Sequence, residues 1–105
     1  MSTTDTFLTV DKHLIVVGWT TGMQELFGYE PSEILGKHVF VLVPPDKADA
    51  AVEVLTRVKV DGRVVGFQTE RLHKSGERLK LTVDLLSIKN MTGDHCATQI
   101  SPRRR

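Results

Sequence analysis

The 105-residue sequence is poor in cysteine, in aromatic residues and in long apolar runs. Its single cysteine, Cys96, excludes an intramolecular disulfide and a zinc site built from several thiolates. No segment has the apolar length of a membrane span, and the first residues lack the basic and apolar regions of a signal peptide. We therefore expect a soluble, cytoplasmic protein.

The sequence also has little net charge. Its 14 Lys and Arg residues nearly balance 13 Asp and Glu, which leaves a formal net charge of +1. This balance excludes a broad nucleic-acid or polybasic membrane surface. The basic residues that do gather, at positions 103–105, are too few for a nucleic-acid patch, and we expect residues 102–105 to be a solvated basic tail or the start of a linker.

What is present is typical of one globular domain, with 40% hydrophobic and 26% charged residues. We expect residues 1–6 to be a flexible segment and residues 7–101 to form the domain. Turn residues, capping residues and hydrophobic periodicity divide this domain into elements. They predict strands at 7–10 and 14–17, short helices at 21–27 and 31–35, a long helix at 46–60, and strands at 63–73, 77–89 and 95–101.

Two of these segments need comment. The uniformly apolar run 39–43 fits a strand, a buried turn or a short helix equally well. The helix at 46–60 is amphipathic, with Glu53 and Arg57 at a favourable spacing for an ion pair. Its predicted buried stripe consists of Ala48, Ala51, Val52, Leu55 and Val58. These residues offer no charged group to anchor a polar ligand.

The order of the elements predicts an α+β fold. Helices stand between two sets of strands that pair as hairpins, which favours a five-stranded antiparallel sheet with helices packed on one face. No nucleophile with a nearby base, phosphate-binding glycine loop or metal-ligand spacing is recognisable. We therefore expect neither catalysis nor a metal site.

An ordered set of short motifs resembles a PAS domain over residues 7–101. The motifs are Gly18-Trp19-Thr20, Leu26-Phe27-Gly28-Tyr29, Glu33-Ile34-Leu35-Gly36, and Phe67, Glu70 and Arg71 before His73-Lys74-Ser75-Gly76-Glu77. The resemblance implies a small cavity between sheet and helices. It also implies a sensory or regulatory module of a signal-transduction protein, serving an attached or partner kinase, phosphatase, cyclase or transcription regulator. Such a module senses a small apolar ligand or mediates dimerisation. The alternative is a ligand-free interaction domain with a filled core.

The resemblance places seven candidate residues around the cavity: Trp19, Met23, His38, Val39, Leu55, Phe67 and Gln99. The motif of flavin-binding light-oxygen-voltage relatives has its reactive cysteine where this chain has Val39. The long helix lacks the histidine that commonly ligates haem in relatives. We expect no cofactor; flavin through Gln99 and haem through His38 are the alternatives that stay open.

Two further expectations concern the core and the surface. Met23 stands where relatives usually carry Ala, and its long side chain is expected to fill cavity space. An apolar patch on the outer face of the sheet is expected to support a homodimer. Its residues are Leu86, Ile88, Cys96 and Thr98 or their alternates on these strands.

Overall fold

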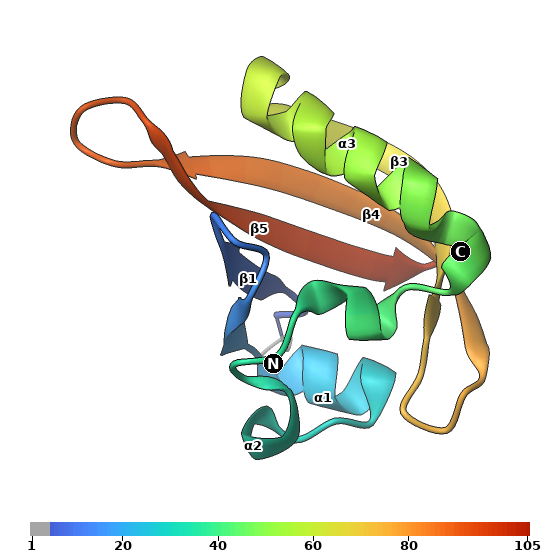
Figure 1. Cartoon of the computed structure of the whole chain (residues 1–105). Helices are drawn as coiled ribbons and strands as arrows, with labels where there is room; N and C mark the ends of the chain where they lie inside the picture. The colour runs from blue at the N-terminus through green and yellow to red at the C-terminus, as the bar shows by residue number, and fades with distance from the viewer. Residues whose placement is uncertain (1–4) are drawn as a thin grey trace.

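The computed structural model describes residues 5–105 and shows an antiparallel sheet with helices on one face (Figure 1). The sheet has five strands in the spatial order β2-β1-β5-β4-β3, which confirms the expected fold class. Helix α3 packs on β3 and β4, whereas α2 packs against β2. The elements are β1 (Leu8–Asp11), β2 (Val16–Trp19), α1 (Thr21–Phe27), α2 (Pro31–Ile34), the 3-10 helices η1 (Val39–Leu42) and η2 (Pro45–Lys47), α3 (Ala48–Asp61), β3 (Arg63–Leu72), β4 (Arg78–Lys89) and β5 (His95–Arg104).

The turn between β1 and β2 forms without glycine because Asp11 takes over its stabilisation. The Asp11 carboxylate accepts the backbone N–H groups of His13 at 2.8 Å and Ile15 at 3.0 Å. These bonds, the Ile15 bond first, lower the pKa of Asp11. Leu14 can then adopt a left-handed backbone, with φ of 65°, that a non-glycine residue rarely takes. The expected hairpin is present, one to two residues later than predicted in each strand.

The two short helices owe their ends to local hydrogen bonds. Thr20, rather than the predicted Thr21, caps α1: its hydroxyl accepts the N–H of Met23 at 3.4 Å. Gly28 ends the helix in the left-handed conformation expected of it, with φ of 83°. In α2, Glu33 accepts the N–H of Glu30 at 2.9 Å and completes a capping box.

The apolar run 39–43 forms the 3-10 helix η1, with Val43 as its C-cap. The exposed His38 precedes it, and its Nδ1 accepts the N–H of Phe40 at 3.2 Å. Val39 and Leu42 turn into the core, while Val41 is 42% exposed. A 3-10 helix repeats every three residues, so one of its sides faces the core and the other faces solvent. Because every residue of the run is apolar, the sequence alone does not show which side is buried.

Helix α3 buries a slightly different stripe from the one predicted. Ala51, Leu55 and Val58 are buried as expected, but Val52 is 53% exposed and Val54 is buried in its place. Ala48 is half-buried. Both stripes have helical spacing and share three members, so the sequence pattern alone cannot choose between them. The predicted ion pair between Glu53 and Arg57 is present at 3.5 Å, on the exposed face.

Strand β5 continues to Arg104, beyond the expected end at 101. Residues 102–104, which were expected to begin a tail or linker, pair with β4, and Pro102 stands opposite Val83. Beyond the pair Leu8 and Ile100, β1 no longer accompanies β5. A proline is tolerated there because the strand has a neighbour on one side only. At the other terminus, residues 1–4 of the expected flexible segment 1–6 lie outside the described residues.

Candidate functional site

A small cavity of about 40 Å³ lies between the sheet, α3 and η1. Its walls come from elements far apart in the sequence, so it forms only when the domain is folded. Apart from one arginine, its lining is apolar. The lining residues are Leu8, Phe27, Val39, Phe40, Leu42, Val43, Ala51, Val54, Leu55, Phe67, Arg71, Val83, Leu85, Ile100 and Pro102.

Three of the seven candidate residues line this cavity, namely Val39, Leu55 and Phe67. Each comes from a different element: Val39 from η1, Leu55 from α3 and Phe67 from β3. They are buried or half-buried, and their side chains are hydrocarbons. This part of the predicted site is therefore brought together as an apolar surface.

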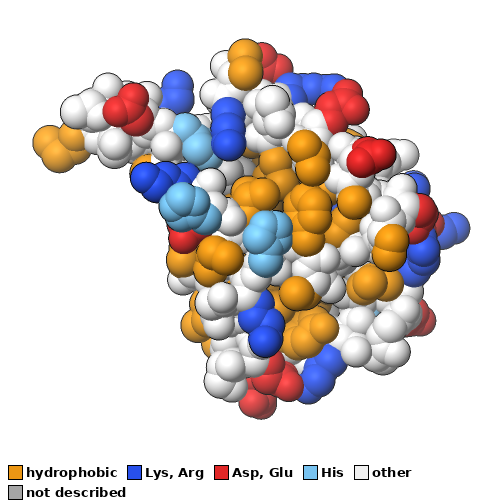
Figure 2. All heavy atoms as spheres, in the orientation of Figure 1, with side chains coloured by type: hydrophobic (Ala, Val, Ile, Leu, Met, Phe, Trp, Pro, Cys, Tyr) orange, Lys and Arg blue, Asp and Glu red, His pale blue; other side chains and the backbone are white. Residues whose placement is uncertain are grey.

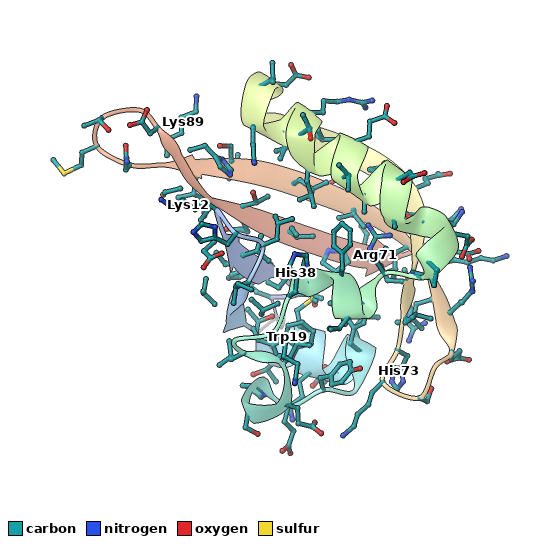
Figure 3. The ribbon with its side chains drawn as sticks, viewed as in Figure 1. Lys12, Trp19, His38, Arg71, His73 and Lys89 are labelled. Carbon is teal, nitrogen blue, oxygen red and sulfur yellow. The ribbon has the colours of Figure 1, made fainter. Side chains whose placement is uncertain are left out.

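The other four candidates lie elsewhere. Trp19 packs on Phe27 with ring centroids 6.0 Å apart, and its Nε1 donates to the carbonyl of Tyr29 at 2.9 Å. Met23 is 0% exposed but belongs to the packed core beside the cavity. His38 is exposed and caps η1, and in Figure 3 it lies apart from Trp19. Met23 does not line the cavity, whose wall on this side is formed by Phe27, one turn later on α1.

Gln99, the fourth of these, stands on the outer face of the sheet opposite Leu86. The neighbouring residues Thr98 and Ile100 point inward, because side chains alternate along a strand. Thr98 is 1% exposed, so it does not belong to the outer apolar patch in which it was expected. The outer face instead presents Leu86 and Val65, 47% and 59% exposed, beside a shallow hollow.

Arg71 is the cavity residue that the sequence reasoning missed. Within residues 5–105 it is the one charged side chain in the lining. Its Nη1 donates to the Thr69 hydroxyl and to the carbonyl of Glu70, each at 2.8 Å. Burial lowers the pKa of Arg71 to about 10, so it remains a cation at neutral pH. In Figure 3 it lies between α3 and η1. The available signal was its place two residues after Thr69 and four residues after Phe67, on one strand face.

Hydrophobic side chains gather on the surface between α3 and the short helices, over the cavity (Figure 2). Phe40, in η1, is only half-buried and lines the cavity, which connects the interior to this surface. Val41 and Val52 add exposed hydrocarbon on η1 and α3. The surface over the cavity is therefore largely hydrocarbon.

The histidines do not form a metal site. Across residues 5–105, no group of three or more His, Cys, Asp or Glu side chains is placed to hold a metal ion. His95 is half-buried, with Nδ1 2.7 Å from the Ser87 hydroxyl, and burial lowers its pKa. Cys96 is half-buried and its Sγ donates to the carbonyl of Ile88 at 3.3 Å. No helix in the described part of the chain is long and apolar enough to cross a membrane.

Comparison with known proteins agrees with this architecture. The model of the PAS family, described as the PAS fold, matches residues 2–104. The chain therefore belongs to the PAS family, whose members are generally sensory or regulatory modules of signalling proteins. No curated protein sequence matches the chain with significance.

Solved structures share the fold at low sequence identity. The PAS domain of a protein from Colwellia psychrerythraea superposes with a TM-score of 0.88 and 24% identity, over 96% of this chain and 86% of that chain. PAS-B of Drosophila melanogaster Cycle, with bound ethylene glycol, has a TM-score of 0.84 and 14% identity, over 94% and 98%. The dark structure of the blue-light photoreceptor Aureochrome1 LOV has a TM-score of 0.79 and 16% identity, over 96% and 75%. At these identities the likeness concerns the fold alone.

The residues present do not fit the flavin that is associated with light-oxygen-voltage domains, nor a haem. Pockets for ligands of drug size typically measure about 300–1,000 Å³, whereas this cavity measures about 40 Å³. Val39 is a buried hydrocarbon without a thiol, and the exposed His38 engages η1 instead of the cavity. Gln99 lies on the opposite face of the sheet from the cavity.

Proposed function

We propose that this chain is a sensory PAS module that binds a small molecule beneath α3 and acts on an attached or partner output domain. The observation that carries the proposal is the apolar cavity of about 40 Å³ at the junction of α3, η1 and the sheet. Such a volume holds about three water-sized groups, so the ligand is small. A molecule in it would contact α3 and η1 together, which gives the domain a way to report occupancy. The cavity contains no nucleophile or general base, so the proposal is binding without catalysis.

The experiment is thermal unfolding with and without a small apolar probe that fits the cavity, such as xenon. Ligand that binds only the folded state raises the melting temperature by mass action. Ala51→Leu adds hydrocarbon to the cavity wall, and Ala50→Leu adds the same atoms to the exposed face of α3. The probe should raise the melting temperature of the wild type and of Ala50→Leu, but not of Ala51→Leu. Ala51→Val serves if the leucine variant is overpacked.

Absence of any probe effect on the wild type would favour the alternative, a ligand-free interaction domain. Native mass spectrometry of the freshly purified protein complements this test because it reports a retained ligand and the oligomeric state together. An absorbance spectrum of the same sample checks for flavin or haem, and we expect no visible absorption.

A second candidate function is self-association through the outer face of the sheet. Leu86 and Val65 expose hydrocarbon there, beside a hollow that also includes Gln99 and Ser101. Exposed apolar surface of this kind is typical of an interface. We propose that a second copy of the chain covers it in a two-fold symmetric dimer, which is compatible with ligand binding on the opposite face.

A further inference from the structure

We propose that the ligand of the cavity is a small aliphatic monocarboxylate, whose carboxylate is held by the guanidinium of Arg71 and whose hydrocarbon part lies against the apolar walls. This inference rests on the proposed function and specifies its ligand. It follows from three properties of the described residues: the missing acidic partner of Arg71, its remaining donors, and the size of the apolar space.

Arg71 differs from the ion-paired arginines of the chain in what it contacts. Arg57, Arg78 and Arg103 are exposed and each forms an ion pair with a carboxylate. Arg71 is half-buried and, within residues 5–105, has no carboxylate at ion-pair distance. A cation that is partly removed from water without an anion is costly to keep in a fold. An acidic ligand would supply the missing charge.

The guanidinium also keeps donors for such a ligand. It has five N–H groups in one plane, and both hydrogen bonds that it makes to the protein come from Nη1. The edge formed by Nε and Nη2 therefore remains available among the described contacts. Two parallel N–H groups on one edge match the two oxygens of a carboxylate. The bonds to Thr69 and Glu70 fix the orientation of the group in advance.

The surroundings limit the rest of the ligand. Phe67, Leu55 and Val39 present hydrocarbon to the cavity, with no hydrogen-bonding group on any of their side chains. A second polar substituent on the ligand would lose its water there without gaining a partner. The volume of about 40 Å³ leaves room for a short chain only. Acetate and propionate are the representative compounds.

The lowered pKa of Arg71 is consistent with this assignment. Burial lowers the pKa of the guanidinium to about 10, because the charged form is partly desolvated. A carboxylate bound beside it would favour the charged form and raise the pKa again. The charge of Arg105 adds to the local positive potential, since its Nη2 donates to the carbonyl of Thr69 at 3.0 Å.

The test compares acetate with acetamide, its neutral isostere, by calorimetry at pH 7.5 and constant ionic strength. In the wild type we expect acetate to bind at least about tenfold more tightly, as for hydrogen bonds to a charged partner. Arg71→Met should lose this preference, whereas Arg63→Met, an exposed position on the same strand, should keep it. Arg71→Gln, which retains a donor for Thr69, replaces the methionine variant if that protein does not fold.

The outcomes separate this inference from the proposed function. Equal affinity for acid and amide in the wild type, or an unchanged preference for the acid in Arg71→Met, would overturn the carboxylate assignment while ligand binding stands. If neither compound nor the apolar probe binds the wild type, both proposals fail. Loss of the acid preference in Arg71→Met with xenon binding retained supports both.

Discussion

The carboxylate of Asp84 accepts the backbone N–H of Gly66 at 2.9 Å, across the irregular part of the β3 and β4 pairing. Gly66 has a φ of 78° there, and the register shifts between Val64 and Phe67. A second oxygen of Asp84 accepts from Arg103 of β5 at 2.8 Å. One side chain therefore connects three strands at the bulge that precedes the cavity residue Phe67.

The first prediction is that Asp84→Ala destabilises the domain by about 1 kcal/mol at pH 7, the usual cost of such a hydrogen bond. The bond from Gly66 is the main reason that the pKa of Asp84 lies below its ordinary value of 3.8. A carboxylate with a lowered pKa in the folded state stabilises it above the unfolded pKa and loses this effect as pH falls through the folded pKa. Urea unfolding should show the wild type approaching the variant below pH 4. A constant difference from pH 7 to pH 2 would contradict this explanation.

The second prediction concerns Met23. It is 0% exposed, so Met23→Ala should cost about 2–5 kcal/mol, depending on how far its neighbours collapse. Met91→Ala makes the same change at a residue that is fully exposed in the β4 to β5 loop, and should change stability by less than about 0.5 kcal/mol. Chemical unfolding of both variants provides the comparison. Similar changes in the free energy of unfolding for the two variants would show that α1 does not bury Met23 in the core.

The third prediction concerns whether the substitution Gly22→Ala raises or lowers the stability of the domain. Alanine is favoured over glycine inside a helix by about 0.5–1 kcal/mol. Here, however, an added Cβ would overlap the carbonyl of Asp5 and approach Thr6 Cα to 2.9 Å. Gly22→Ala should therefore destabilise the full chain, yet stabilise a chain that begins at Phe7. Thermal unfolding of the four proteins decides, and stabilisation in both backgrounds would show that residues 5–6 do not pack on α1.

The fourth prediction concerns self-association. The wild type should sediment as a dimer at micromolar concentration, and Leu86→Lys should sediment as a monomer, because a charge would be placed in the apolar contact. Val60→Lys introduces the same charge at an 80% exposed position of α3 and should leave the dimer intact. A wild-type protein that stays monomeric at high concentration would exclude this interface.

Much of the fold could be predicted because turns, caps and periodicity agreed. Gly28 marked the end of α1, and strict alternation identified Leu79 and Leu81 on the buried face of β4. The phase of α3 was harder, since Val52 and Val54 both fit a helical stripe. The extent of β5 was missed because Pro102 normally ends a strand, and only the short length of β1 makes it tolerable.

The cavity was harder to predict than the fold. Val39, Leu55 and Phe67 could be assigned from the family resemblance because apolar residues at those motif positions face inward. Arg71 could not, since a charged residue on a strand is ordinarily assigned to the wet face. Its inward position becomes clear only when its alternation with Phe67 is followed along β3. Met23 was expected at the cavity, whereas Phe27 lines it. The sequence could not distinguish the two, because both lie on the buried face of one short helix.

The pairing of β1 with β5 has a consequence for synthesis of the protein. Leu8 finds its partner Ile100 only when nearly the whole domain has been translated. At a synthesis rate of about 5–20 residues per second, Leu8 and Val10 of the N-terminal hairpin lack their β5 partners for seconds. Contacts so distant in sequence also slow folding once the chain is free. The hairpin is thus made first and joins the sheet last, so its apolar residues lack their β5 partners in the nascent chain for that time.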